Sequence, residues 1–347
     1  MRTYHISIKN YADKVKQFLY IIALKEVVII HYIVMDLEWN QNPTGKENED
    51  SKLPFEIVEI GAHKLNEQYE VVDSFQCVIA PRIYTELSPY IKKIVPVTSD
   101  ELEKGIDFEV AIKAFFKWCG KDVIFCTWGS MDLTELQRNI AYYKLESPFP
   151  KPLIFYDIQK LFSIQFSNGK TRISLEHAID FLELDKDIPF HRAKADTHYT
   201  VKVMQKLDMD MLKKNYSIDL YNNPKSRDEE IYATFGDYSK FVSKEYDSKE
   251  DAMRDSVVTA TRCFECNKNL RKKVRWFSTN GKIYYCLVYC DKHGWLRGKI
   301  RMKKTEDGKF FVVRTLKLVD EAGADEVRTR KEEVKLKRRI RRHKGKE

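Results

Sequence analysis

The sequence contains no apolar run long enough to span a membrane. Two apolar stretches lie within residues 18–35, but Lys25, Glu26 and His31 interrupt them, and a spanning helix needs about 18 or more consecutive apolar residues. No small-residue cleavage site of a secretory leader follows. We therefore expect no membrane partner, interpret the second stretch as a buried strand, and assign residues 1–30 to an N-terminal extension outside the main domain.

The sequence also lacks the even set of closely spaced cysteines that cross-links small secreted domains. Of its seven cysteines, Cys77, Cys119 and Cys126 stand singly in apolar surroundings, as small core residues do. The other four lie between Cys263 and Cys290. An odd total without a cleavable leader argues against a disulfide framework and favours a reducing compartment, so we predict a cytoplasmic location.

Charge is abundant but unevenly distributed. The chain has 347 residues, 43% hydrophobic and 33% charged, which is typical of a globular catalytic domain with a smaller module. Its formal net charge is +9, yet residues 261–347 alone contain 27 Lys and Arg against 11 Asp and Glu. A net acidic body with a basic C-terminal part predicts a polyanionic partner bound at that end. A tail that is basic only for solubility is the alternative.

Residues 31–207 have the periodicity of a mixed-sheet α/β domain. Residues 32–39, 57–64 and 74–79 alternate as strands do, and their short connections predict an antiparallel meander. The elements expected after the meander are residues 108–118 (helix), 123–127 (strand), 133–143 (helix), 153–156 (strand), 174–182 (helix) and 196–207 (helix).

The remaining sequence predicts three further parts. Residues 208–260 are polar and are expected to form a linker with some helix. Residues 261–318 are expected to form a compact, basic, β-rich zinc-binding module. Residues 319–347 form a basic tail, in which the last 21 residues contain eleven Lys and Arg and are expected to be disordered by themselves.

Three acidic motifs fall at the ends of predicted elements. Asp36 and Glu38 lie two apart on the first strand, so both side chains point to one face, where only cations would offset their repulsion. A strand end in solvent is the alternative. Asp132 opens a helix directly after a strand, where a simple helix cap is the favoured interpretation of its position alone. Asp196 begins the last helix and His191 precedes it; a cap and a surface histidine are again the alternative.

Taken together and in this order, the motifs resemble the DnaQ-like exonuclease superfamily, in its branch named for Asp-Glu-Asp-Asp ligands and a histidine five residues before the last Asp. Residues 56–62 and the Ser174-Leu175 pair resemble further family elements, and Trp128-Gly129 resembles the Eri/KapD-like subgroup. Many relatives have Asn where Trp128 stands, which weakens assignment to a DNA proofreading subunit. The resemblance implies a ribonuclease H-like fold, with a mixed five-stranded sheet flanked by helices.

The resemblance also implies a metal-dependent 3′→5′ exonuclease that releases nucleoside 5′-monophosphates by a two-metal mechanism. Two Mg²⁺ or Mn²⁺ ions would be held by carboxylates, with Asp36 bridging both, Glu38 and Asp196 on the nucleophile side and Asp132 on the other. His191 would act as general base. Single-stranded 3′ ends are the implied substrates, with RNA slightly favoured over DNA.

Leu37 and Trp39 flank the first motif on the same strand. They are candidates for lining the channel that holds the terminal nucleotide. Core packing is the favoured alternative for apolar and aromatic side chains on strands.

Two knuckles near the C-terminus have metal-ligand spacing. Cys263 and Cys266 form a C-x2-C pair, and Cys290 and His293 form a C-x2-H pair. Such pairs suit one tetrahedral structural Zn²⁺ in a zinc-ribbon-like module. Cys286 is an alternative fourth ligand in place of His293.

Alternating cations follow the second knuckle. Arg297, Lys299, Arg301 and Lys303 would share one face of a strand, where they suit a nucleic-acid backbone. This feature leaves a second function open, a non-catalytic nucleic-acid-binding protein that acts through the zinc module and tail. Nothing in the sequence determines the oligomeric state.

Overall fold

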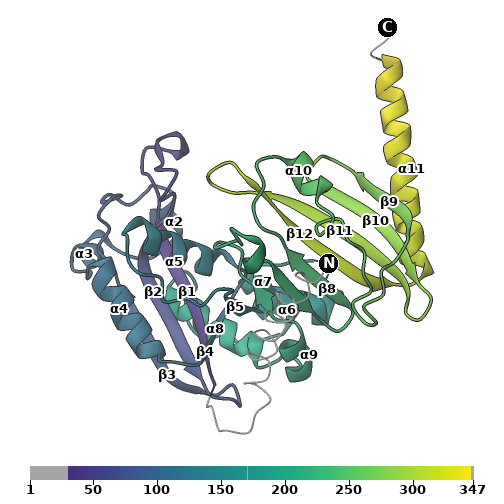
Figure 1. Ribbon diagram of the computed structural model, residues 1–347. Helices are drawn as coiled ribbons and strands as arrows, with labels where there is room; N and C mark the ends of the chain where they lie inside the picture. The colour runs from purple at the N-terminus through teal and green to yellow at the C-terminus, as the bar shows by residue number, and fades with distance from the viewer. Residues whose placement is uncertain (1–29, 170, 345–347) are drawn as a thin grey trace. The chain divides into compact units, whose positions relative to one another are not determined.

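The computed structural model describes residues 30–169 and 171–344, which form two compact units that divide between Asn222 and Asn223 (Figure 1). We call them the N-terminal and C-terminal units. The predicted extension, residues 1–30, lies outside the described residues except for its last position. No helix within the described ranges combines the length and apolar character needed to cross a bilayer.

The N-terminal unit contains a mixed sheet in the order β3-β2-β1-β4-β5-β6. Its strands are β1 (His31–Asn40), β2 (Glu56–Leu65), β3 (Val71–Val78), β4 (Val123–Thr127), β5 (Ile154–Asp157) and β6 (Ser217–Ile218). The first three form the predicted antiparallel meander, and β4 and β5 run parallel to β1. The mixed α/β fold is confirmed, but the sheet has a sixth strand. Because β6 contains only two residues, no alternating pattern could reveal it.

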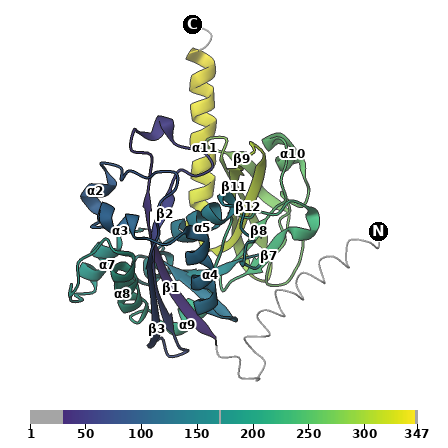
Figure 2. The ribbon, with the colours of Figure 1, turned by 90° about the vertical axis from the view of Figure 1, so that its left-hand side faces the viewer.

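Helices cover both faces of this sheet. In chain order they are η1 (Lys46–Asn48), α2 (Ile91–Ile94), α3 (Ser99–Glu103), α4 (Phe108–Cys119), α5 (Met131–Tyr142), α6 (Ile158–Ser167), α7 (Leu175–Phe181), α8 (Ala193–Met204) and α9 (Met209–Lys214). Figure 2 shows α4 and α5 on one side of the strands and α7 and α8 on the other.

The two faces of β1 have different partners. Ile33, Met35 and Leu37 pack in a buried core with the apolar stripes of α4 and α5. The alternate residues, including Asp36 and Glu38, therefore point to the opposite face, which α8 covers. The alternation of β1 thus places two carboxylates beneath α8.

The C-terminal unit contains a second sheet, in the order β7-β8-β12-β11-β10-β9, whose strands all pair antiparallel. Its strands are β7 (Ile231–Thr234), β8 (Tyr238–Val242), β9 (Lys272–Ser278), β10 (Ile283–Cys290), β11 (Gly294–Lys304) and β12 (Phe310–Val319). The helices are η2 (Arg227–Glu229), α10 (Lys249–Arg254) and α11 (Glu321–Lys344). The predicted β-rich module is present.

Two sequence expectations about this part differ from the structure. The predicted linker, residues 208–260, contains α9 and β6 of the N-terminal unit and the strands β7 and β8, and β8 pairs with β12. Long-range strand pairing, which the local polarity of a segment does not reveal, orders these residues.

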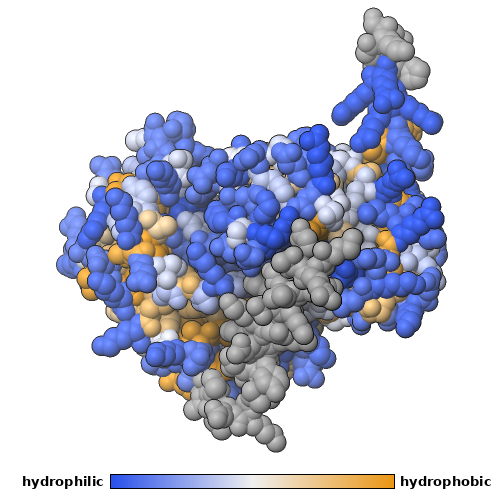
Figure 3. All heavy atoms as spheres, viewed as in Figure 1, coloured by the Kyte–Doolittle hydropathy of each residue, from blue (hydrophilic) through white to orange (hydrophobic). Residues whose placement is uncertain are grey.

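The tail expected to be disordered forms α11, because Ala324 and Val327 are buried in an apolar cluster with Tyr285 and Leu287 of β10. The rest of α11 extends beyond the sheet with a mostly hydrophilic surface (Figure 3), in which Leu336 and Ile340 are exposed.

Candidate active site and metal centres

Three carboxylates meet where β1 passes beneath α8. Asp36 and Glu38 come from β1 and Asp196 from the first turn of α8. Each offers an oxygen atom, and these three atoms all lie within 4.8 Å of one another. Asp132, in the first turn of α5, is 5% exposed, and its carboxylate lies close enough to Asp36 to raise the pKa of that group by repulsion. The structure thus brings together the four carboxylates that the motifs predicted.

Gly61 allows α8 to approach the sheet this closely. It pairs with Asp36 across β1 and β2. A Cβ atom at this position would lie 2.2 Å from the backbone nitrogen of Lys194 and 2.3 Å from the carbonyl carbon of Ala193. Any side chain here would push the start of α8, and Asp196 with it, away from β1.

Burial and mutual repulsion raise the pKa values of these carboxyl groups. Burial, followed by repulsion from Asp132, Asp196 and Glu38, holds the pKa of Asp36 well above its usual range. Burial first, and then repulsion from Asp196, raises the pKa of Glu38 to about 8. Burial raises the pKa of Asp132 to about 7 and that of Asp196 to about 6, although backbone hydrogen bonds act in the opposite direction. Such a cluster of oxygen donors suits hard divalent cations, which would neutralise it.

His191 lies on the exposed loop directly before α8. Its backbone has a left-handed φ of 68°, and its N–H donates to Oδ1 of Asp196 at 3.4 Å. The loop therefore places His191 beside the last carboxylate of the cluster, at an exposed position.

Arg192 fixes the other side of this loop through an ion pair that the sequence analysis did not identify. Its Nε atom lies 2.9 Å from Glu59, which is fully buried on β2, and its Nη1 atom lies 3.2 Å from Glu101 of α3. Glu59 stands opposite Glu38 in the strand register and also accepts from Gln76 at 2.6 Å. A glutamate within the otherwise apolar stretch 57–62 of β2 was the available signal, but its partner lies 133 residues away.

The two C-terminal knuckles also converge. The ligand atoms of Cys263, Cys266, Cys290 and His293 all lie within 4.8 Å of one another. The Nδ1 atom of His293 is 3.4 Å from Sγ of Cys263 and 3.6 Å from Sγ of Cys290. Although burial acts in the opposite direction, hydrogen bonds lower the pKa of the Cys290 thiol to about 6, which favours the metal-binding thiolate.

Cys286 is not part of this cluster. It is fully buried on β10 next to Gly298, where an added Cβ would lie 2.3 Å from its Sγ atom and 2.7 Å from the ring of Trp276. Of the two alternatives for the fourth ligand, the geometry therefore favours His293.

The candidate nucleic-acid-binding residues differ in their surroundings. Leu37 is 3% exposed and lies in the core, which agrees with the alternative that it serves core packing. Trp39 is partly buried and packs against the same core. Arg297, Lys299, Arg301 and Lys303 do alternate along β11. Two of these cations already have partners: Arg297 lies 3.5 Å from Glu326, and Lys299 lies 5.7 Å from the centre of the Tyr285 ring.

Comparison with known proteins agrees with this geometry. Residues 33–204 match the family model RNase_T, described as exonuclease. The probable 3′-5′ exonuclease KapD of Bacillus subtilis (strain 168) is 28% identical over 118 residues, which are 34% of this chain and 56% of that protein. The chain thus matches little more than half the length of this curated relative.

Two solved structures are also similar to part of this chain. The nuclease domain of 3′hExo, a DEDDh family member bound to rAMP, is 20% identical with a TM-score of 0.46, covering 56% of this chain and 98% of that one. A structure described as 3′-end specific recognition of histone mRNA stem-loop by 3′-exonuclease is 19% identical with a TM-score of 0.44, covering 62% and 80%.

Proposed function

We propose that this chain is a metal-dependent 3′→5′ exonuclease, because residues 33–204 match the family model described as exonuclease. It would hydrolyse nucleic acid from single-stranded 3′ ends and release nucleoside 5′-monophosphates, with RNA slightly favoured over DNA. The observation that carries the proposal is the meeting of Asp36, Glu38 and Asp196 within 4.8 Å, with Asp132 next to them.

The four carboxylates have the chemistry to hold two divalent cations. Asp36 would bind both ions. Glu38 and Asp196 would bind the ion on the nucleophile side, and Asp132 would bind the other ion. Mg²⁺ or Mn²⁺ in such a site lowers the pKa of a water molecule and stabilises negative charge on the leaving oxygen. Burial, together with repulsion from Asp196 and Glu59, raises the pKa of Glu38 to about 8, and a bound cation would offset that repulsion.

His191 would accept the proton of the attacking water. The water oxygen forms a bond to phosphorus, the bond from phosphorus to the 3′-oxygen breaks, and the leaving oxygen takes a proton from solvent. An imidazole near neutral pH suits the first proton transfer. The backbone contact from His191 to Asp196 supports this role, because it holds the histidine next to the carboxylates.

In the C-terminal unit, one Zn²⁺ would be held by Cys263, Cys266, Cys290 and His293 and would stabilise the fold without taking part in the chemistry. Four protein donors leave no open position for a substrate. The cations of β11 and α11 would contact the nucleic-acid backbone, since the charge of this part is strongly positive.

A time course of degradation tests the proposal. Single-stranded RNA and DNA, labelled at either end, would be incubated with the full chain in Mg²⁺, Mn²⁺ or EDTA. We expect stepwise shortening from the 3′ end that stops in EDTA and in Asp36→Ala. Asp210→Ala, which removes an exposed carboxylate on α9, is the matched control and should retain the activity. Tight binding with no shortening would reject the proposal and favour the non-catalytic binding protein.

A further inference from the structure

A pocket of about 440 Å³ lies on one face of the C-terminal sheet and is lined only by residues of the C-terminal unit. The strand register defines its floor: Tyr232 pairs with Phe241, and Phe241 pairs with Arg314, so these three side chains share one face. The segment that leads from α10 into the first knuckle, residues 256–269, forms the opposite wall.

Arg314 lies in the floor of this pocket with only part of its hydrogen-bonding capacity used. The residue is 7% exposed. Its Nη1 atom donates to the carbonyl oxygens of Val257, Val258 and Ala260 at 2.6, 3.0 and 2.9 Å, and the guanidinium lies 4.7 Å from the centre of the Phe241 ring. Within the described residues, Nε and Nη2 donate to no protein atom, and neither is sealed from solvent. Three N–H donors of the guanidinium, one on Nε and two on Nη2, therefore remain available.

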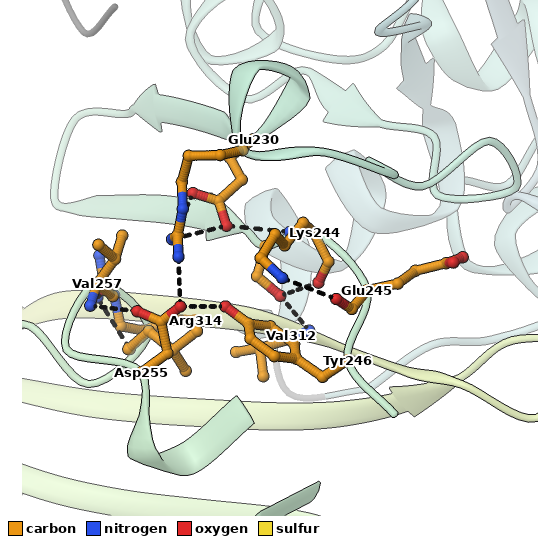
Figure 4. Close-up of polar contacts among 11 residues, drawn as sticks. Glu230, Lys244, Glu245, Tyr246, Asp255, Val257, Val312 and Arg314 are labelled. Carbon is orange, nitrogen blue, oxygen red and sulfur yellow. Dashed lines mark hydrogen bonds and ion pairs between the residues drawn. The ribbon is translucent and has the colours of Figure 1, made fainter. Parts of the chain in front are cut away.

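Arg314 forms no direct ion pair with a described residue; burial lowers its pKa, and Glu230 raises it only as a more distant charge. Among the residues that the structure describes, no carboxylate oxygen lies within 4.0 Å of its nitrogens. The nearby Glu230 and Asp255 are engaged elsewhere: Arg227 forms ion pairs with both, and Asp255 also accepts from Tyr246 at 2.6 Å (Figure 4). Because burying an unpaired cation is costly, a ligand that supplies acceptor atoms here would be stabilised.

The rest of the pocket combines aromatic and hydrogen-bonding groups. Tyr232 is 42% exposed and Phe264 comes from the first knuckle, so both offer ring surface. Ser256, Asn267 and Asn269 add polar groups at the wall. Aromatic rings stack on any nucleobase, and an arginine fork fits acceptor pairs such as those of a phosphate or of the O6 and N7 edge of guanine.

We propose that this pocket binds one nucleotide, whose base packs against Tyr232 and Phe264 and whose phosphate or guanine edge accepts from Arg314. A pocket of this volume is within the range of small-ligand sites and accommodates a single nucleotide unit. The site lies entirely in the C-terminal unit and needs neither the carboxylate cluster nor its cations. Because the first knuckle forms one wall, nucleotide binding should depend on the metal held by Cys263 and its partners.

Photo-crosslinking with peptide mapping tests the location directly. The full zinc-loaded chain would carry Asp36→Ala, so that no substrate is consumed. Two probes separate the sources of the nucleotide: 8-azido-GMP, and a short oligonucleotide with one 4-thiouridine. We expect adducts in peptides that contain Tyr232 or Phe264. Adducts from both probes assign the pocket to a free nucleotide, and adducts from the oligonucleotide alone assign it to a nucleic-acid strand. Adducts confined to residues 31–207 would overturn the proposal.

Variants give a second measurement. Tyr232→Ala removes an exposed ring, and Arg314→Lys retains the charge but not the fork; each should reduce adduct yield and GMP affinity about tenfold. Tyr289→Ala removes a ring that is 39% exposed on the opposite face of the sheet and serves as the matched control. Unchanged affinity in Tyr232→Ala would contradict the proposal even if Arg314→Lys failed to fold. A chain without exonuclease activity could still give these adducts, so the two proposals fail separately.

Discussion

At the scale of single residues, the carboxylate cluster makes the folded chain sensitive to pH when no divalent cation is bound. The folded-state pKa values of Glu38, Asp132 and Asp196 lie at about 8, 7 and 6, above the usual values of the unfolded chain. Between about pH 4 and 8 the folded state therefore binds more protons than the unfolded state, and stability falls as pH rises.

We accordingly expect the melting temperature of Mg²⁺-free protein to fall by several degrees between pH 5 and pH 8, since each kcal/mol shifts it by about 2–4 °C. Added Mg²⁺ should reverse the fall by binding the ionised carboxylates. Measured by differential scanning calorimetry, the melting temperature of Asp36→Asn should depend less steeply on pH than that of the wild type. Asp210→Asn, which changes an exposed carboxylate, should keep the wild-type dependence. Equal slopes in both variants would assign the pH dependence to other groups.

The ion pair between Arg192 and Glu59 gives a second prediction at this scale. Arg192→Met leaves the fully buried Glu59 without its cation, which should cost about 3–5 kcal/mol of unfolding free energy. Adding Glu59→Gln should recover most of this loss in urea denaturation, because the uncompensated charge is gone. We expect kcat to stay about tenfold low in the double variant with KM little changed, because Arg192 also positions the His191 loop. A fully restored kcat would limit the pair to a structural role.

At the scale of elements, the packing of α8 on the sheet depends on Gly61. Gly61→Ala forces the backbone of Ala193 and Lys194 to move, and a misplacement of about 1 Å at a catalytic group costs roughly 100-fold in rate. We expect kcat/KM to fall by about this factor while Mg²⁺ affinity also weakens. Gly236→Ala is the control, since an added Cβ there meets nothing within 4 Å. Normal activity in Gly61→Ala would mean that α8 can shift without disturbing Asp196.

The two knuckles give a prediction about metal content. Cys290→Ser removes a ligand from the cluster and should abolish bound Zn²⁺ and lower the stability of the C-terminal unit. Cys286→Ala removes a thiol that contacts Gly298 instead, so it should keep about one Zn²⁺ per chain by elemental analysis. Retention of zinc by Cys290→Ser together with its loss in Cys286→Ala would reverse the ligand assignment.

At the scale of the whole molecule, the excess of positive charge in the C-terminal part should govern nucleic-acid affinity. Ending the chain after Arg330 removes nine Lys and Arg but keeps Ala324 and Val327, which pack α11 on the sheet. We expect weaker binding of oligonucleotides and a shallower dependence of affinity on salt, because fewer counterions are released. Fluorescence anisotropy at several salt concentrations measures both. An unchanged slope would show that the removed part of α11 makes no phosphate contacts.

The sequence by itself determined the mixed α/β fold and the position of the acidic motifs, because these depend on local period and spacing. Asp36 and Glu38 share a face whenever that segment is a strand, and the family match to residues 33–204 confirms the resemblance. Likewise, the C-x2-C and C-x2-H spacings identified the four residues that converge in the C-terminal unit.

Only the tertiary structure decided which distant residues complete these sites. Glu59 and Arg192 are far apart in sequence and meet because α8 packs over Gly61. The strand β8 lies in a polar segment and becomes ordered by pairing with β12, and Arg314 acquires its surroundings from β7, β8 and the segment before the first knuckle. Such contacts depend on strand register and helix packing between distant segments, which local patterns of charge and hydrophobicity do not specify.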